Sequence, residues 1–170
     1  MRMRRISWLP AALLLGLIGC AGVQKDLYLP RDFQPRQYQQ LAVLNLDPQV
    51  VFSEYAEAEL LKKGYKVKEH SLVRQVLRKE GLTQEESLEP QALARLGGLL
   101  GVQGIVLCRV LEFSRFRDAY RLSIKMVDPA SSQTVWSAQG FLEGKKGMRS
   151  SELLRQIVHS TLKDLPPVPE

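Results

Sequence analysis

The side chains that most often catalyse reactions or bind metals are few and widely separated in this sequence. The 170 residues include two histidines, His70 and His159, and two cysteines, Cys20 and Cys108. A metal site needs His, Cys or acidic ligands at short spacings, and a nucleophilic cysteine needs a neighbouring base or cation. We therefore expect no metal site. His70 should be a helix-entry residue, His159 a favourable charge near a helix C-terminus, and Cys108 a small buried side chain.

Two other patterns look like sites but lie in the wrong place. A phosphate-binding loop follows a strand and opens a helix, whereas the glycines between residues 98 and 104 close a predicted helix and open a strand. Glu85, Glu86 and Glu89 form an acidic cluster in a predicted polar loop, where carboxylates are usually solvated. An enzyme is therefore the least favoured function, and we predict that the chain is not one.

Arginine and aromatic residues are concentrated around one predicted hairpin. Such residues are enriched where proteins dock onto one another. A charged, solvent-facing sheet surface has a similar composition, and so does a sheet that binds nucleic acid. The candidate partner-binding residues are Phe113, Arg115, Phe116, Arg117, Tyr120 and Arg121.

The first twenty residues have the pattern of a bacterial export signal. Three arginines precede a short apolar run, in which Pro10 disfavours a membrane-spanning helix. The run ends at Leu17-Ile18-Gly19-Cys20, which resembles the lipobox of bacterial lipoproteins. That resemblance implies cleavage after residue 19 and attachment of a diacylglycerol and an N-acyl chain, typically palmitate, to Cys20. The alternatives are a signal peptide with a chance cysteine at its end, or an uncleaved anchor.

Export and lipidation restrict the remaining chemistry. If Cys20 is alkylated, Cys108 is the only thiol left and no intramolecular disulfide can form. Without the signal arginines, 21 basic residues face 18 acidic ones, which is too small an excess to indicate nucleic-acid binding. Apart from the covalent lipid we predict no cofactor.

The residue after the cysteine and the following segment predict where the domain lies. Ala21 stands where an aspartate would retain a lipoprotein of enteric bacteria in the inner membrane. By that resemblance we expect the outer membrane, with the domain facing the periplasm. Residues 20–40 lack sustained periodicity and are predicted to be an extended tether, which would reach about 65 Å at 3.3 Å per residue.

The remaining chain has the periodicity of one α/β domain over residues 41–165, followed by a proline-rich tail over residues 166–170. The order β-α-β-α-α-β-β-β-α predicts a mixed sheet with helices packed on it. Predicted strands cover residues 41–46, 65–70, 102–116, 120–126 and 134–142. Predicted helices begin at Asp47-Pro48, Ser71, Pro90 and Ser150 or Ser151.

Two of these helices have predicted core faces. In the first helix, which should run to Lys63, the inward residues are Val51, Tyr55, Ala58 and Leu61. In the last helix they are Leu153, Leu154, Ile157, Val158, Thr161, Leu162 and Leu165.

Several of these segments together resemble the CsgG-type lipoprotein domain, over roughly residues 41–144. The matching segments are residues 41–46, 60–67, 69–77 and 96–107, and the hairpin Val127-Asp128-Pro129-Ala130-Ser131-Ser132-Gln133-Thr134-Val135-Trp136. Proteins of this type include the curli secretion channel, the LpoB lipoproteins that activate penicillin-binding proteins, and small envelope lipoproteins. The predicted turns at residues 117–119 and 128–133 leave no room for the transmembrane hairpins of the channel.

The resemblance and the residues lead to one expected function and one alternative. We expect a non-enzymatic, periplasm-facing outer-membrane lipoprotein. It would be an accessory or binding subunit in envelope assembly, secretion or cell-wall synthase regulation, with an envelope protein as its partner. The alternative is a subunit of an oligomeric CsgG-like export complex, and self-association into a homo-oligomer stays open.

Overall fold

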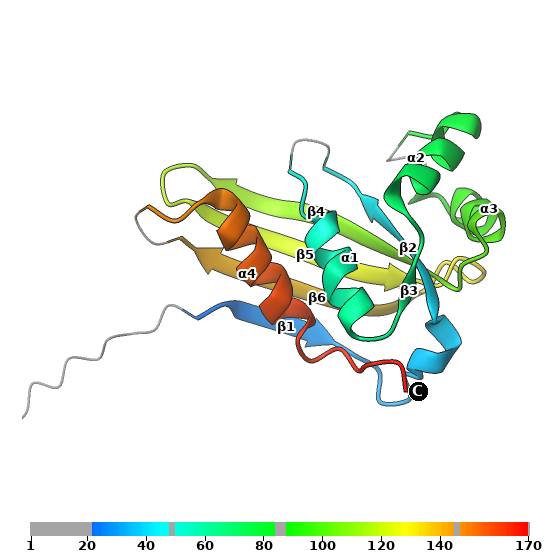
Figure 1. The fold of residues 1–170 in the computed structure, drawn as a ribbon, viewed down its shortest axis with the longest axis horizontal. Coiled ribbons are helices and arrows are strands. Elements are labelled where there is room, and N and C mark those ends of the chain that lie inside the picture. Colours follow the sequence, from blue (N-terminus) through cyan, green and yellow to red (C-terminus); the bar gives the residue numbers. More distant parts are fainter. Residues whose placement is uncertain (1–21, 48–49, 84–87, 145–146, 170) are drawn as a thin grey trace, which may run out of the picture.

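Six strands form one mixed sheet at the centre of the computed structural model, which describes residues 22–47, 50–83, 88–144 and 147–169. The strand order is β1-β6-β5-β4-β2-β3, and β2 runs parallel to both β3 and β4 while the other pairs are antiparallel (Figure 1). The strands are β1 Gln24–Tyr28, β2 Gln40–Asn45, β3 Lys66–Val67, β4 Gly104–Ser114, β5 Ala119–Val127 and β6 Thr134–Glu143.

Helices cover the two faces of the sheet unequally. On one face α1 (Ser53–Lys62) and α4 (Ser150–Leu162) pack side by side on the large core, which includes Trp136, Phe52 and Ile157. On the other face α2 (His70–Lys79) and α3 (Pro90–Leu100) cover mainly β2 and β4, around Leu96 and Ile105. The predicted α/β class, with a mixed sheet and packed helices, is confirmed.

The C-terminal helix α4 buries the face that its sequence predicts. All seven apolar-stripe residues have little exposed surface: Leu153, Leu154, Ile157, Val158, Thr161, Leu162 and Leu165. The helix lies so close to β6 that a Cβ atom on Gly140 would overlap Thr161 and Ile157. Removing the stripe from water is the main contribution of α4 to the stability of the large core.

From residue 22 on, the structure contradicts the extended tether predicted for residues 20–40, whose first two residues lie outside the described ranges. β1 pairs with β6 from Gln24 opposite Phe141 to Tyr28 opposite Ser137, and a short 3-10 helix, η1, covers Pro35–Tyr38. Leu27 packs against the large core, and Lys25 forms an ion pair with Asp164 after α4. An edge strand with one inward apolar residue has no clear alternation, so its sequence looks like a linker.

The first helix also begins later and faces differently than predicted. It starts at Ser53, because Asp47 does not cap it: the Asp47 carboxylate accepts a hydrogen bond from the Val110 amide at 2.6 Å instead. The buried residues at the helix start and along α1 are Phe52, Ser53, Ala56, Glu59 and Leu60. Val51, Ala58 and Leu61, which we expected to face inward, are exposed, and Tyr55 is only partly buried. The later start changes which residues of the helix face the sheet.

The chain after α4 is held against the domain. The Tyr65 hydroxyl donates to the Pro166 carbonyl at 2.9 Å, and the Val168 amide donates to the Lys63 carbonyl at 2.8 Å. Lys63 in turn donates from its ammonium group to the carbonyls of Lys163 and Leu165, at 2.9 and 2.6 Å. The proline-rich segment is therefore part of the packed structure in its described residues.

Candidate functional site

The six predicted partner-binding residues do not form one surface, because they project in three directions. Residues 115–118 form the turn between β4 and β5, where Arg115, Phe116 and Arg117 are exposed. Phe116 is completely exposed, at 104% of its reference area. No element of the described chain covers its ring.

Phe113 and Tyr120 lie on the side of the sheet that α1 and α4 cover, and their rings stack with centroids 4.6 Å apart. Tyr120 belongs to the large core and is only 6% exposed, so the prediction that it contacts a partner directly is wrong. Every second side chain of β5 points toward α1 and α4, and Tyr120 is one of these buried side chains.

Arg121 lies on the opposite side of the sheet, on a surface that we call the open face. Directly opposed residues of antiparallel strands project to the same side, so the pairing register identifies its members. They include Arg109, Glu112, Arg121, Ser123, Lys125, Ser137, Gln139, Phe141, Gln24, Asp26 and Tyr28. The helix that contacts β1 and β6 is α4, which lies on the other side of the sheet.

The open face is polar, with aromatic side chains in it. The Arg121 guanidinium lies 4.8 Å from the centroid of the Phe141 ring and 3.4 Å from the Glu112 carboxylate. Tyr28, on the edge strand, is 61% exposed. Arginine, tyrosine and phenylalanine on a flat surface resemble the composition of protein interfaces.

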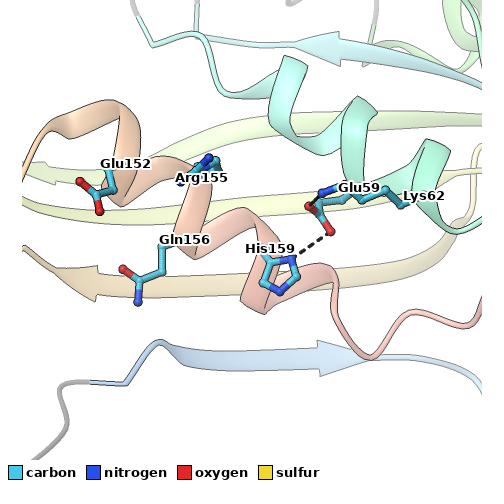
Figure 2. Close-up of a pocket in the computed structure, with 6 residues that line it drawn as sticks. All are labelled: Glu59, Lys62, Glu152, Arg155, Gln156 and His159. Atoms are coloured by element: carbon cyan, nitrogen blue, oxygen red, sulfur yellow. Dashed lines mark hydrogen bonds and ion pairs between the residues drawn. The ribbon is translucent and has the colours of Figure 1, made fainter.

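A cleft of about 480 Å³ lies between α1 and α4 (Figure 2). Its centre is Glu59, which accepts from Lys62 at 2.7 Å and lies 3.0 Å from Nδ1 of His159. Burial raises the pKa of Glu59, but the hydrogen bonds from Lys62 and His159 outweigh it and leave the pKa below its usual value. The lining residues are Glu59, Lys62, Glu152, Arg155, Gln156 and His159.

The contacts in this cleft are those of a link between two helices. An ionised Glu59 joins Lys62 on its own helix to His159 on α4. Figure 2 shows Glu59 and His159 as neighbours across the cleft. The lining set contains no Ser, Thr or Cys that His159 could activate as a nucleophile. The sequence places Glu59 and His159 far apart, and only the packing of α4 on α1 brings them together.

A second cluster of ionisable side chains lies at the start of α2. Nδ1 of His70 lies 3.7 Å from Oε1 of Glu57, and neither atom has a hydrogen-bond partner among the described residues. Burial, together with Glu54 and Glu69, raises the pKa of Glu57 to about 7. We did not predict this cluster from the sequence. The feature that could have indicated it is Glu54, a second carboxylate three residues before Glu57 on the same helix.

Cys108 is close enough to Glu57 to sense its charge, but its burial makes it unreactive. The residue has no exposed surface, and burial, with a further contribution from Glu57, raises the pKa of the thiol far above its ordinary value. A protonated, inaccessible thiol is a poor nucleophile. The prediction that Cys108 is a small buried side chain is confirmed.

A second cleft lies at the end of the sheet near η1. The Tyr38 hydroxyl donates to the Asp128 carboxylate at 3.2 Å, and the rings of Phe33 and Tyr38 stack with centroids 6.1 Å apart. Burial and the neighbouring Asp128 raise the pKa of Tyr38. This cleft of about 330 Å³ was not predicted, because seven of its twelve lining residues come from the segment expected to be a tether.

Neither a metal cluster nor a spanning helix was found where the structure describes the chain. Across residues 22–169, apart from the short undescribed segments, no three His, Cys, Asp or Glu side chains are placed to hold a metal ion. The helices in those same ranges are too short or too polar to cross a bilayer.

The fold has counterparts among solved structures. Lipoprotein GNA1162 from Neisseria meningitidis superposes with a TM-score of 0.58 at 19% identity, covering 75% of this chain and 96% of that one. This chain has the fold of that lipoprotein. A PelC dodecamer from Paraburkholderia phytofirmans has a subunit that superposes with a TM-score of 0.57 at 12% identity, covering 85% of this chain and 99% of the other.

Sequence comparison adds no relative. No protein-family model matches the chain, and no curated protein matches it. At identities of 19% and 12% the structural likeness establishes the fold and leaves function to be argued from the residues.

Proposed function

We propose that this chain is a non-enzymatic, lipid-anchored protein of the outer membrane that faces the periplasm and binds another envelope protein. It would be an accessory subunit of the CsgG type, in envelope assembly, secretion or regulation of a cell-wall synthase. The observation that carries the proposal is the position of Cys20. It ends the lipobox-like tetrad and lies four residues before Gln24, where β1 begins. The predicted cleavage point thus lies a few residues before the first strand of the domain, which supports the lipoprotein proposal.

The state of the ionisable groups supports a binding role. Glu59 and His159 are used to join two helices, and Cys108 is buried. The structural likeness to a lipoprotein, GNA1162, supports a membrane-anchored envelope protein.

The open face is the proposed contact surface for the protein partner. It combines Arg121, Phe141 and Tyr28 with polar residues, and it extends over the four neighbouring strands β4, β5, β6 and β1. A partner on this face would shield β5, β6 and β1 from water, as α2 and α3 shield β2 and β4.

Lipidation of Cys20 is tested by metabolic labelling with an alkyne analogue of palmitate in a bacterial host. We expect label on the wild-type chain and its recovery in washed outer membranes. Cys20→Ala should be unlabelled and should accumulate as an uncut precursor or as soluble protein. Cys108→Ala is the matched control, because it removes the other cysteine and should stay labelled. The proposal fails if Cys20→Ala appears in washed outer membranes at normal mass and amount.

A second candidate function is a subunit of a self-assembled export complex. The observation that favours it is the likeness to PelC, whose solved structure is a dodecamer and which this chain matches over 85% of its length. In that case the open face, or the edge strands β1 and β3, would contact further copies of the same chain.

A further inference from the structure

The turn between β4 and β5 carries a side-chain combination that the fold does not use. Phe116 has its whole ring in solvent, although burial of a phenylalanine is normally worth about 1.5–3 kcal/mol. Arg115 and Arg117 flank it and are exposed as well. An aromatic ring between guanidinium groups matches the headgroup region of a bilayer, where the ring enters the acyl boundary and arginine binds lipid phosphate.

This turn lies at the same end of the sheet as the start of β1. Gln24 is opposite Phe141, and two residues further along β6, Glu143 is opposite Ala119 at the foot of the turn. The amide of Gly144 also donates to the carbonyl of Asp118 in the turn at 3.0 Å. Figure 1 shows the β4–β5 turn, the start of α4 and the start of β1 together at one end, with η1 and the β5–β6 turn at the other.

The distances match those that a membrane contact needs. Two residues along a strand correspond to about 7 Å, so Glu143 lies about that far in front of Gln24, and the turn that carries Phe116 lies beyond Ala119, the residue opposite Glu143. The four residues from Cys20 to Gln24 can span at most about 14 Å. A lipid on Cys20 would therefore keep this end of the sheet, with the β4–β5 turn, within reach of the bilayer surface.

We propose that the β4–β5 turn rests in the surface of the bilayer that holds the lipidated Cys20. Phe116 enters the boundary between headgroups and acyl chains, and Arg115 and Arg117 bind lipid phosphates. This inference rests on the proposed lipidation and adds a second, non-covalent membrane contact. It orients the sheet, since η1 and the β5–β6 turn then point away from the membrane and the open face stands at its side.

Tryptophan fluorescence in vesicles that contain nitroxide-labelled lipid tests this contact. The probe is the full mature, lipidated chain with Phe116→Trp, incorporated into vesicles of phosphatidylethanolamine and phosphatidylglycerol. Ala130→Trp is the matched control, because Ala130 is exposed in the turn at the opposite end of the sheet. The native Trp136 has no exposed surface and serves as a constant background.

We expect the added emission of the Phe116→Trp chain to shift to the blue and to be lost when nitroxide lipid is present, and that of the Ala130→Trp chain to be unchanged. The proposal is overturned if the protein sediments with the vesicles while the Phe116→Trp emission is unquenched or is quenched no more than the control emission. A blue-shifted but unquenched emission from Phe116→Trp would overturn it too, because the ring would then be covered by protein, such as a second copy. If the mature chain recovered from the bacterial host carries no lipid on Cys20, the lipidation proposal is overturned, and this inference with it.

Discussion

Glu57 is a carboxylic acid whose pKa depends strongly on the tertiary structure. It lies on α1 near Glu54 and Glu69, two like charges, and close to His70 and the buried thiol of Cys108. Burial is the largest contribution, and the pKa of the carboxyl is raised from 4.5 to about 7. The folded chain therefore holds this proton more tightly than the unfolded chain does between those two pH values.

The sign of the resulting pH dependence follows from linkage. Where the folded state binds more protons, stability falls as pH rises, so the Glu57 contribution is lost between about pH 4.5 and 7. Glu57→Gln should be more stable than wild type at pH 8, by about 1–2 kcal/mol after solvent screening, and about equal to it near pH 4.5. Urea unfolding at both pH values measures the difference.

Glu152→Gln is the control for this pH experiment. Glu152 is exposed at the start of α4, and its replacement should leave the pH dependence of wild type intact. If the stability difference between Glu57→Gln and wild type is the same at both pH values, the carboxyl does not titrate as described.

At the scale of elements, the closest contact is between α4 and β6. Gly140 has no side chain where Thr161 and Ile157 of α4 approach the strand. Gly140→Ala would force the helix and the sheet apart, at a cost of about 1–3 kcal/mol. Thermal unfolding of the variant should show a lower Tm than wild type.

Gly98 provides a matched control for the same chemical change. It lies in the exposed part of α3, and a Cβ atom there would meet nothing within 4 Å. Gly98→Ala should stabilise the chain by about 0.5–1 kcal/mol, because alanine is the better helix former. If both variants shift the Tm in the same direction by similar amounts, α4 does not pack on β6 as closely as described.

At the scale of the whole molecule, docking of β1 changes how far the domain lies from the membrane. The predicted tether of residues 20–40 would have reached about 65 Å, whereas four residues reach about 14 Å. A lipid on Cys20 would hold the whole sheet next to the bilayer, so a protein partner would have to meet it there.

The two candidate functions differ in what the protein does alone in a membrane. The β4–β5 and β5–β6 turns are residues 115–118 and 128–133, with no inserted hairpin in either. We expect the purified, lipidated chain to give no conductance steps in planar bilayers, because an accessory subunit acts through its partner. Reproducible channels of uniform size from the protein alone would favour the export-complex function instead.

Local sequence determines those elements whose signal lies within their own residues. Pro90 and Gly101 bound α3, and Gly101 adopts the left-handed conformation that a helix end requires. The α4 stripe and the alternation in β5 identify buried faces directly, because the periods of 3.6 and 2 reflect one-sided burial. The absence of a nearby partner for Cys108 in the sequence likewise predicts its burial as an inert thiol.

Tertiary structure alone decided the features that depend on residues distant in the chain. β1 exists because its backbone pairs with β6, more than a hundred residues later, and such pairing leaves little trace in the side chains of an edge strand. The Glu59–His159 contact, the burial of Tyr120 and the raised pKa of Glu57 also arise from packing. The β4–β5 turn lies at the same end of the sheet as the start of β1 only because of the strand order. Local periodicity cannot encode that order, because it indicates which face is buried and not which neighbour covers it.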